Sequence, residues 1–566
     1  MKLLKYITTS LLAIASIFNI SAAEADSAII KRTVTIEKNY IPDIQNAAKI
    51  SELPGISEPE LQQPEVNYSQ YSTLMEPPYE IRPLEAARLK IPVPPERKNG
   101  YLRLGLGTSW TTLGDLIYPL INKPEYRLDF NANHIGTFKN RMHHDSELGL
   151  SFHRYYKSGN ELTLNASYGF EGFNYYGKNK LKSDTVYTLN NSRLKGKDFF
   201  KDDAFISTWN LSGAYKSVFT EEKIQRYTLQ LDYNGFSPNE GLKEHIINTN
   251  ALYERKLDEN KFGAILNLKN LIYNTNNANY TVFEQKGYSI FSLNPYFDFQ
   301  QEKWKLHIGV NAAFSGQGRA FNPMPDITLD ATLIDKALYF SGGIVGDLAA
   351  NTMNDMEQLN RYMNLNEKVK NTYSPTNVYG NLKLKLLYNC SVDLKLGYKI
   401  VKDQYFFVNE TLADTLTQTA IYANVFKPVY ADANLLYSSI KLNYNLNQML
   451  ALLFDWRYNS WKLSGGGTAW QMPKNEFDIG IDLNLTKRLG ANINCYFATG
   501  RKALALDGSE KALKSMADIN LGVFYAHSSK VSMFLKFNNI INRHYEQWYG
   551  YEVNGFNAMI GLAFAF

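Results

Sequence analysis

The stretch FDIGIDLNLTKRLGANINCYF, residues 477–497, decides the fold of this chain. Apolar side chains alternate with polar or small ones from Phe477 to Leu485 and again from Leu489 to Phe497, with only residues 486–488 between the two runs. Successive residues of a β-strand point to opposite faces, so each run predicts a strand with one apolar and one polar face. The short connection predicts that the two strands form an antiparallel hairpin.

The same alternation recurs from residue 100 to the end of the chain, for example in residues 101–107, 127–133 and 304–314. Alternating segments of about ten residues are the pattern of transmembrane β-strands. A soluble β-protein also alternates, but it has to cover its apolar face with a second sheet. It rarely repeats strands of this length so many times. We therefore predict an all-β fold, a large antiparallel transmembrane β-barrel over residues 100–566. The mean hydropathy of the chain, -0.33, suits a barrel whose inner face is polar.

The lengths of the connections predict the number of strands. Short turns are expected near residues 157–160, 256–260, 300–303, 333–336, 388–391, 445–448, 486–488 and 527–529. Longer connections fall between them, near residues 136–145, 173–202, 274–287, 316–325, 349–375, 408–432, 460–475, 500–515 and 539–555. Short turns on one side and long loops on the other are typical of outer-membrane barrels. If 112–120 is a strand and 408–432 is one outer loop, the count is about 22 strands, an even number, with both ends of the chain in the periplasm. A count of 18 or 20 strands would require one or two misread hairpins.

The first 25 residues predict a cleaved signal peptide. Lys2 and Lys5 precede an apolar stretch at residues 7–20, and Ala23-Glu24-Ala25 offers an A-x-A cleavage site. Cleavage there would make Asp26 the first residue of an exported protein. No cysteine lies near the site, which argues against a lipoprotein anchor; an uncleaved anchor helix is the alternative.

Residues 26–99 predict an extended proline-rich segment, either periplasmic or inserted into the lumen. Ten of the 19 prolines of the chain lie there, a density that disfavours helix interiors and central strands. Within this segment the alternating residues 31–40 could add a strand to the edge of a partner's sheet. The residues proposed for this docking strand are Thr33, Val34, Thr35, Ile36 and Glu37. The alternative is a leader whose apolar residues have no such role.

The end of the chain predicts the last barrel strand. A closed barrel needs its final strand to pair with the first one. An alternating apolar strand that ends in an aromatic residue is similar to the signal read by the machinery that inserts barrels into the outer membrane. The residues of this insertion signal are Phe556, Ile560, Leu562, Phe564 and Phe566.

The other face of the strands predicts the lining of the lumen. It is polar, rich in amides and mixed in charge, which suits small polar solutes, although any water-filled barrel would have such a lining. The residues expected there are Arg103, Asp129, Asn131, Asn133, Glu147, Asp482, Asn484, Asn492 and Asn494.

No motif in the sequence indicates an enzyme, a cofactor or a metal site, and we expect none of the three. His143, His144 and Asp145 are the best metal candidates, but adjacent residues of an extended chain point to opposite sides and do not converge on an ion. Cys390 and Cys495 are predicted to be free thiols. The net charge is only +5, without a basic run, so nucleic acid is not an expected partner.

The later part of the chain resembles the barrel of TonB-dependent receptors, particularly those of the Bacteroidota. The resemblance is carried by residues 321–326 (FNPMPD), 405–409 (YFFVN), 537–545 (FNNIINRHY) and the final strand, and it covers about the last half of the chain. It implies a Gram-negative outer-membrane location, contact with outer-membrane lipid, about 22 strands and the transport of small nutrients, with a periplasmic energising protein as a partner. Those receptors also carry a plug domain of well over a hundred residues, and residues 26–99 leave no room for one.

Two function classes therefore stay open. A barrel of this size without a plug must be filled by folded-in loops such as 173–202 and 349–375, by the proline-rich segment or by another protein. In the first class the protein is a receptor-like transporter or porin-like channel for small polar solutes. In the second it is an accessory barrel of an outer-membrane assembly, secretion or surface-display complex, and residues 26–99 dock it to other subunits.

Overall fold

The computed structural model describes residues 100–139, 141–177, 186–189, 192–195, 201–220, 223–275, 285–413, 420–447 and 449–566. The predicted signal peptide, the proline-rich segment and the docking strand at Thr33–Glu37 lie outside these described residues.

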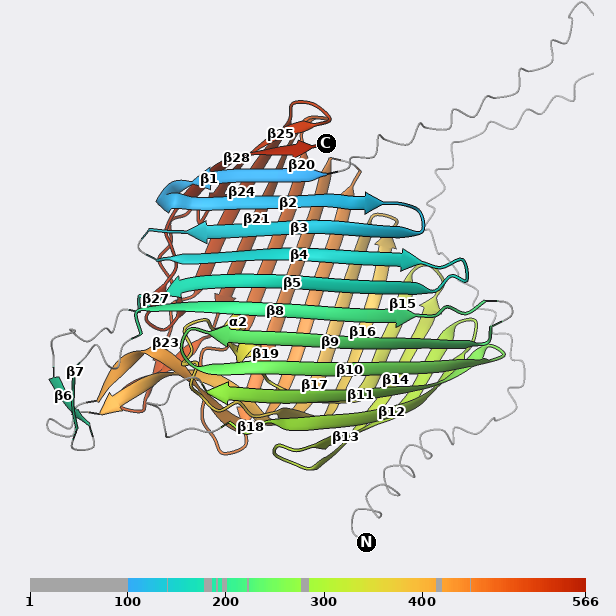
Figure 1. The fold of residues 1–566 in the computed structure, drawn as a ribbon, viewed down its shortest axis with the longest axis horizontal. Coiled ribbons are helices and arrows are strands. Elements are labelled where there is room, and N and C mark those ends of the chain that lie inside the picture. Colours follow the sequence, from blue (N-terminus) through green and yellow to red (C-terminus); the bar gives the residue numbers. More distant parts are fainter. Residues whose placement is uncertain are drawn as a thin grey trace, which may run out of the picture. The chain divides into compact units, whose positions relative to one another are not determined.

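The described chain forms one closed antiparallel barrel of 22 strands, as predicted (Figure 1). Each strand pairs with its neighbours along the chain, and β1 pairs with β28 to close the ring. The first half of the barrel consists of β1 (Tyr101–Gly107), β2 (Thr111–Asn122), β3 (Tyr126–Thr137), β4 (His143–Tyr155), β5 (Glu161–Asn174), β8 (Asp203–Lys216), β9 (Gln225–Pro238), β10 (Leu242–Leu257), β11 (Asn260–Thr275), β12 (Tyr288–Gln300) and β13 (Trp304–Ser315). The second half consists of β14 (Phe321–Ile334), β15 (Leu338–Ala349), β16 (Thr372–Leu387), β17 (Cys390–Ala413), β18 (Ala420–Leu446), β19 (Leu450–Leu463), β20 (Asn475–Asn484), β21 (Leu489–Thr499), β24 (Met516–Ala526), β25 (Val531–Asn538) and β28 (Asn557–Ala565).

Smaller elements belong to the connections. They are the 3₁₀ turn η1 (Thr108–Trp110), the hairpins β6 (Val186–Leu189) with β7 (Ser192–Lys195), β22 (Lys502–Leu504) with β23 (Glu510–Ala512) and β26 (Glu546–Trp548) with β27 (Tyr551–Glu552), and the helix α2 (Met353–Leu359). No helix among the described residues is long and apolar enough to cross a membrane.

The outward face of the barrel is apolar. Large side chains such as Leu106, Leu396 and Ile560 are 67%, 59% and 63% exposed. A water-soluble protein rarely exposes a contiguous apolar surface of this extent, whereas lipid covers such a surface on a transmembrane barrel. The sequence therefore alternates because one face of each strand meets lipid, as we inferred. A soluble β-protein does not fit this exposed apolar surface.

The seam between β1 and β28 closes the ring. Leu104 pairs with Leu562 and Gly105 with Gly561. The last residue continues the pairing, because the amide of Gly100 donates to the carbonyl of Phe566 at 2.7 Å and the amide of Phe566 donates back at 3.0 Å. The Phe566 ring stacks on Tyr118, with 6.0 Å between ring centroids. The predicted insertion signal thus lies on the final strand and the residues that flank it, with its aromatic end at the seam, and its role in assembly stays a prediction.

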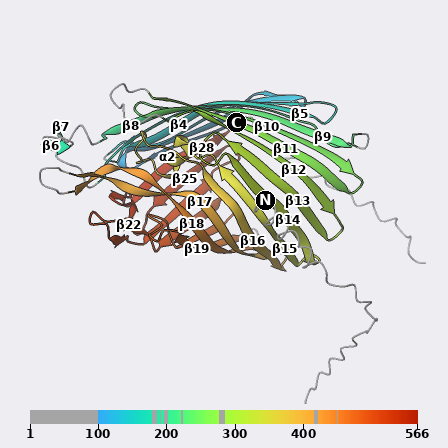
Figure 2. The ribbon, with the colours of Figure 1, turned by 90° about the horizontal axis from the view of Figure 1, so that it is seen from below.

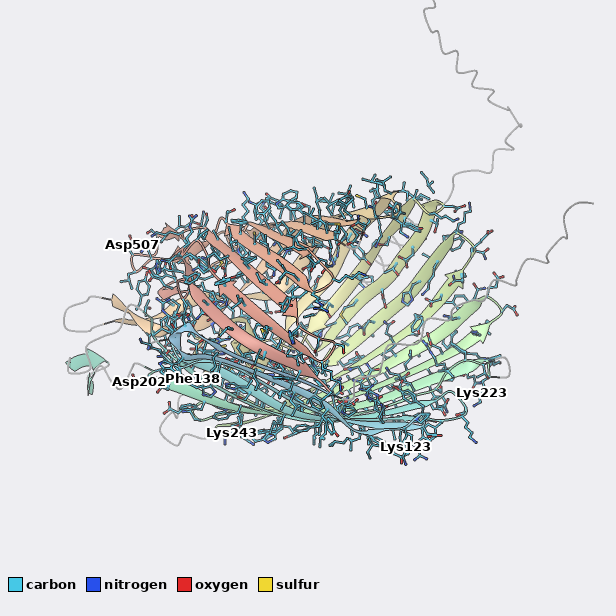
Figure 3. All side chains as sticks on the ribbon, turned by 90° about the horizontal axis from the view of Figure 1, so that it is seen from above. Lys123, Phe138, Asp202, Lys223, Lys243 and Asp507 are labelled. Carbon is cyan, nitrogen blue, oxygen red and sulfur yellow. The ribbon has the colours of Figure 1, made fainter. Side chains whose placement is uncertain are left out.

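The two ends of the barrel differ in their connections (Figures 1 and 3). Lys123 and Lys223 lie in short turns at one end, while Phe138, Asp202 and Asp507 lie at the opposite end, which carries α2 and the small hairpins. Seen from below, the blue and green strands form one wall, and the yellow to red strands form the wall that faces it (Figure 2). We refer to the two ends as the short-turn end and the long-loop end.

Three predicted loops are wrong in extent. Residues 408–432 are not one loop, because β17 continues to Ala413 and β18 begins at Ala420. Phe406, Phe407 and Val408 are all buried there, so this extension packs on both faces and loses the alternation that marks a lipid-facing strand. The FNPMPD stretch opens β14 instead of lying in a loop, and the connection predicted at 136–145 shrinks because β4 already begins at His143.

Candidate functional site

The inner wall of the barrel collects the polar residues of the strands. Residues paired across neighbouring antiparallel strands point to the same side of a sheet. Arg103 pairs with Asp115, and its guanidinium lies 2.5 Å from the Asp115 carboxylate. Register pairs then lead from Asp115 through Asn133 to Glu147. Asn131 and Asp129 lie on the same side of β3, so this group of predicted residues shares one wall.

The remaining predicted lumen residues lie on β20 and β21. Asp482 pairs with Asn492, Gly480 with Asn494, and Asn484 with Gly490. They occupy the side opposite to the outward apolar residues of the same strands. The wall between these two regions also carries Lys383, Lys395 and Lys441 on the polar side of β16, β17 and β18, and Asp393 lies between Lys383 and Lys441 in the register. The Lys395 ammonium lies over the rings of Tyr379 and Tyr437, 5.2 Å and 5.6 Å from their centroids.

The lumen is crossed by the connection between β15 and β16, which we call the cross-lumen segment (residues 350–371). It contains α2, and its methionines Met353, Met356 and Met363 are fully buried. Fully burying a methionine side chain contributes about 1.5–3 kcal/mol, so these residues hold the segment in place. An inward fold of 349–375 was among the possibilities that the sequence left open, and the burial of these residues supports it.

The first turn of α2 is fixed by two caps. The Thr352 hydroxyl accepts a hydrogen bond from the Asp355 amide at 3.0 Å, the N-cap contact that Thr at this position provides. Glu244 on β10 is fully buried, and its carboxylate accepts hydrogen bonds from the amides of Met353 and, at 3.4 Å, of Asn354. The barrel wall thus satisfies backbone donors of the helix that would otherwise be buried without a partner.

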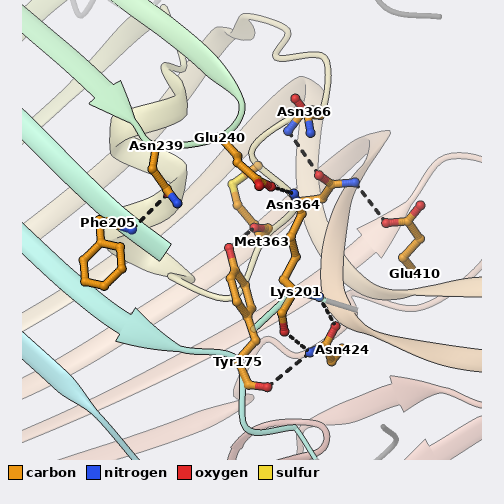
Figure 4. A network of polar contacts seen from close by, with 10 residues as sticks. All are labelled: Tyr175, Lys201, Phe205, Asn239, Glu240, Met363, Asn364, Asn366, Glu410 and Asn424. Atoms are coloured by element: carbon orange, nitrogen blue, oxygen red, sulfur yellow. Dashed lines mark hydrogen bonds and ion pairs between the residues drawn. The ribbon is translucent and has the colours of Figure 1, made fainter. Parts of the chain in front are cut away.

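The segment also joins opposite sides of the ring. The Tyr175 hydroxyl, directly after β5, donates to the Met363 carbonyl at 3.5 Å, and the Asn364 amide donates to the Phe426 carbonyl on β18 at 2.7 Å. In the ring, β5 and β18 are separated by β8 to β17 in one direction and by β19 to β4 in the other. Figure 4 shows this junction, in which the Asn424 side chain donates to the carbonyls of Tyr175 and Lys201 at 3.1 Å and 2.7 Å.

Aromatic rings extend this junction to the connection between β25 and β28. Tyr362 stacks on Tyr551 with 3.6 Å between centroids and an angle of 15°. The Tyr551 hydroxyl donates to the Asn424 carbonyl, and Tyr176 packs edge-on against Tyr551. The cross-lumen segment is therefore held by at least three parts of the wall at the long-loop end.

The two ends of the segment lie side by side. The Asn351 side-chain amide donates to the Lys370 carbonyl at 2.7 Å and to the Thr372 hydroxyl at 2.8 Å. β15 and β16 are paired directly, from Ala349 with Thr372 onward. The segment is thus a closed excursion from a hairpin that can pair without it.

A cavity of about 290 Å³ lies between α2 and the wall formed by β4, β5 and β8. Its lining includes Asp145, Glu147, Glu171, Glu357 and Arg361. The Arg361 guanidinium lies 3.8 Å from the Glu171 carboxylate. Glu357, on the helix, is only 2% exposed, and its burial together with the neighbouring Glu171 raises the pKa of its carboxyl to about 8.

The histidine pair does not form a metal site. His143 faces the lumen, with its imidazole 3.3 Å from Glu171, whereas His144 points outward and stacks between Phe138 and Phe170. Both open strand β4 instead of lying in the predicted outer loop. Within the described residues no cluster of His, Cys, Asp and Glu could hold a metal ion, and both cysteines there are free.

Sequence reasoning missed Glu244, Glu357 and the buried methionines. Thr352 followed by Asp355 is a helix-start signal inside a long loop, so α2 itself was detectable. The contact of Glu244 with Met353 joins residues 109 positions apart, and no local pattern marks it.

The fold is similar to that of known receptors. No protein-family model matches this chain, and no curated protein matches it. Among solved structures, it is similar to the ferric-catecholate import receptor Fiu of E. coli K12 (TM-score 0.59, 8% identity, covering 83% of this chain and 82% of that one). It is also similar to a mutant of the ferric enterobactin receptor PfeA of Pseudomonas aeruginosa in complex with enterobactin (0.61, 12%, 82% and 81%) and to the copper transporter OprC (0.58, 11%, 83% and 81%).

This chain shares the barrel fold of these three solved structures. At these identities the likeness concerns the fold alone.

Proposed function

We propose that this protein is an outer-membrane transporter for small polar solutes, and that its cross-lumen segment controls passage. The observation that carries the proposal is the segment itself, which joins Tyr175 and Phe426 across the ring and is anchored on Glu244. The apolar outer face suits lipid, and the polar wall suits hydrated solutes. The barrel likeness to import receptors supports the same class of function.

Electrical conductance of the purified protein in planar lipid bilayers tests this proposal. The test variant replaces residues 352–370 with a short Gly-Ser linker, which Asn351 and Thr372 can accommodate because the ends of the segment are adjacent. A matched control replaces the exposed hairpin tip 506–509. We expect a low conductance for the native protein and for the control, and a large, steady conductance for the variant.

Folding of the variant is checked on denaturing gels, on which a folded barrel migrates more slowly after heating than before it. A correctly folded variant with native conductance would overturn the proposal, because the segment would then not restrict passage. A native protein that already conducts as strongly as the variant would do the same.

The accessory-subunit alternative depends on residues 26–99, which lie outside the described part of the chain. A mild-detergent pull-down of the tagged protein, with and without these residues, separates the two functions. Purification of the barrel alone favours the transporter. Stoichiometric recovery of other outer-membrane or periplasmic proteins, lost with residues 26–99, favours the accessory subunit. An energising periplasmic partner would be lost on deletion of residues 31–40 alone.

A further inference from the structure

The cavity beside α2 is strongly acidic. Four carboxyl groups line it, those of Asp145, Glu147, Glu171 and Glu357, against the single guanidinium of Arg361. Its volume of about 290 Å³ is near the lower end of small-molecule pockets. Strands β4 and β5 of the wall contribute Asp145, Glu147 and Glu171. The cross-lumen segment contributes Glu357 and Arg361, so the site exists only while the segment is docked.

The charges in the cavity are not balanced. Glu171 has two partners, Arg361 at 3.8 Å and the His143 imidazole at 3.3 Å. Asp145 and Glu147 form no salt bridge with any described residue. Like charges on neighbouring strands repel each other, so the arrangement stores repulsion that a bound cation would relieve.

Glu357 supplies a second, independent observation. Its exposed fraction is only 2%, and its Oε1 atom has no hydrogen-bond partner among the described residues. A buried polar atom without a partner costs about 1–3 kcal/mol, and a charged one costs more. Because Glu357 lines the cavity, a donor bound there would lie beside its carboxyl group.

We propose that this cavity binds the cationic group of a small organic solute, an ammonium or a guanidinium. Such a group brings several N–H donors, which match the carboxylate of Glu147 and, once the cation displaces its proton, that of Glu357. The amides of Asn354 and Gln358 line the same cavity and offer neutral acceptors. A bare metal ion is a poorer match, since no described carboxylate and histidine cluster converges on one point.

This inference deepens the proposed function, on which it rests for the idea that the bound solute is also the transported one. Binding at a site built half by the wall and half by the segment would couple the solute to segment docking. The coupling needs only that the solute binds the docked state better than the undocked state.

Calorimetric titration of the purified full-length protein in detergent tests the site. The probes are n-butylammonium and ethylguanidinium, with n-butanol and butyrate as neutral and anionic counterparts of similar size. We expect saturable binding of the two cations only, weakened at least tenfold in Glu357→Gln and in Glu147→Gln. The matched control is Asp455→Asn, which removes a carboxylate from the polar side of β19, remote from β4 and β5 in the ring, and is expected to bind as the native protein does.

Glu147→Gln guards against misfolding, because its side chain lies on the barrel wall and supports no helix contact. Equal affinity of the native protein and both variants, or equal binding of butanol and butylammonium, would overturn the inference. If the cations do not bind but the segment replacement still opens the barrel, this inference fails and the proposed function stands. If the cations bind and the replacement changes no conductance, the site stands and its role in transport fails.

Discussion

The contact between Glu244 and α2 leads to the sharpest prediction. In Glu244→Ala the amides of Met353 and Asn354 lose their acceptor inside a fully buried environment. We expect the cross-lumen segment to undock more often while β10 stays in the barrel, because the strand is held by its backbone pairing with β9 and β11.

The magnitude follows from two opposing effects. Each buried amide left without a partner costs about 1–3 kcal/mol. Removal of the buried Glu244 carboxylate also removes its own desolvation cost, which offsets part of this loss. A net destabilisation of about 2 kcal/mol would raise the undocked population roughly 30-fold, since 1.4 kcal/mol corresponds to a factor of ten.

Hydrogen exchange followed by mass spectrometry measures this population. Exchange of peptides covering residues 350–371 should become roughly 30-fold faster through local opening, and peptides from β10 should not change. Lys243→Ala is the matched control, because Lys243 is the neighbour of Glu244 and points to the other side of the strand. Unchanged exchange at 353–356 in a folded Glu244→Ala barrel would refute the claim that this contact holds the segment.

Three further predictions concern other parts of the chain. The raised pKa of Glu357 means that the docked segment holds its proton more tightly than the undocked segment, so docking weakens as pH rises from about 4.5 to about 8. Bilayer conductance should therefore be higher at pH 9 than at pH 6, and Glu357→Gln should reduce the difference; a native conductance independent of pH would contradict this. Gly561→Val should abolish the folded, heat-modifiable band on gels, since a Cβ at this seam position would overlap the Phe534 ring and the Leu104 carbonyl oxygen. A normal folded band would show that the seam can shift to accept it. Deletion of residues 31–40 should leave the folded band intact and remove a co-purifying partner, and an unchanged set of partners would rule out the docking strand.

Much of the fold could be predicted from the sequence because lipid imposes a simple rule. Most lipid-facing residues are apolar and every second residue faces lipid, so the runs around Ile481 and Ile493 reveal their strands without any tertiary information. Short turns such as residues 486–488, alternating with long loops, then indicate an even number of strands. The same rule places Arg103 and Glu147 on the inner side.

The rule fails where the chain leaves the lipid. Phe406 to Val408 are consecutive apolar residues, because at the long-loop end the wall packs on the cross-lumen segment as well as on its neighbours. The acidic cavity could not be predicted from the sequence for a related reason. Glu147 and Glu357 are brought together by the folding of the segment, and each of them alone resembles an ordinary polar residue.

The seam between β1 and β28 has a consequence for how the barrel forms. Every other pairing in the ring joins strands that follow one another along the chain, but Tyr101 has to find Ala565. The loop closed by this pairing is about four doublings longer than the loop of about 30 residues closed by two consecutive strands. Each doubling of loop length costs about 0.6 kcal/mol of entropy, so closing the seam costs roughly 2.5 kcal/mol more. Pairings of such high contact order form late, so the first strand keeps an open edge until the last residues are in place. An assembly factor that holds the two edge strands together would remove that cost, and the predicted insertion signal on β28 lies where such a factor would have to bind.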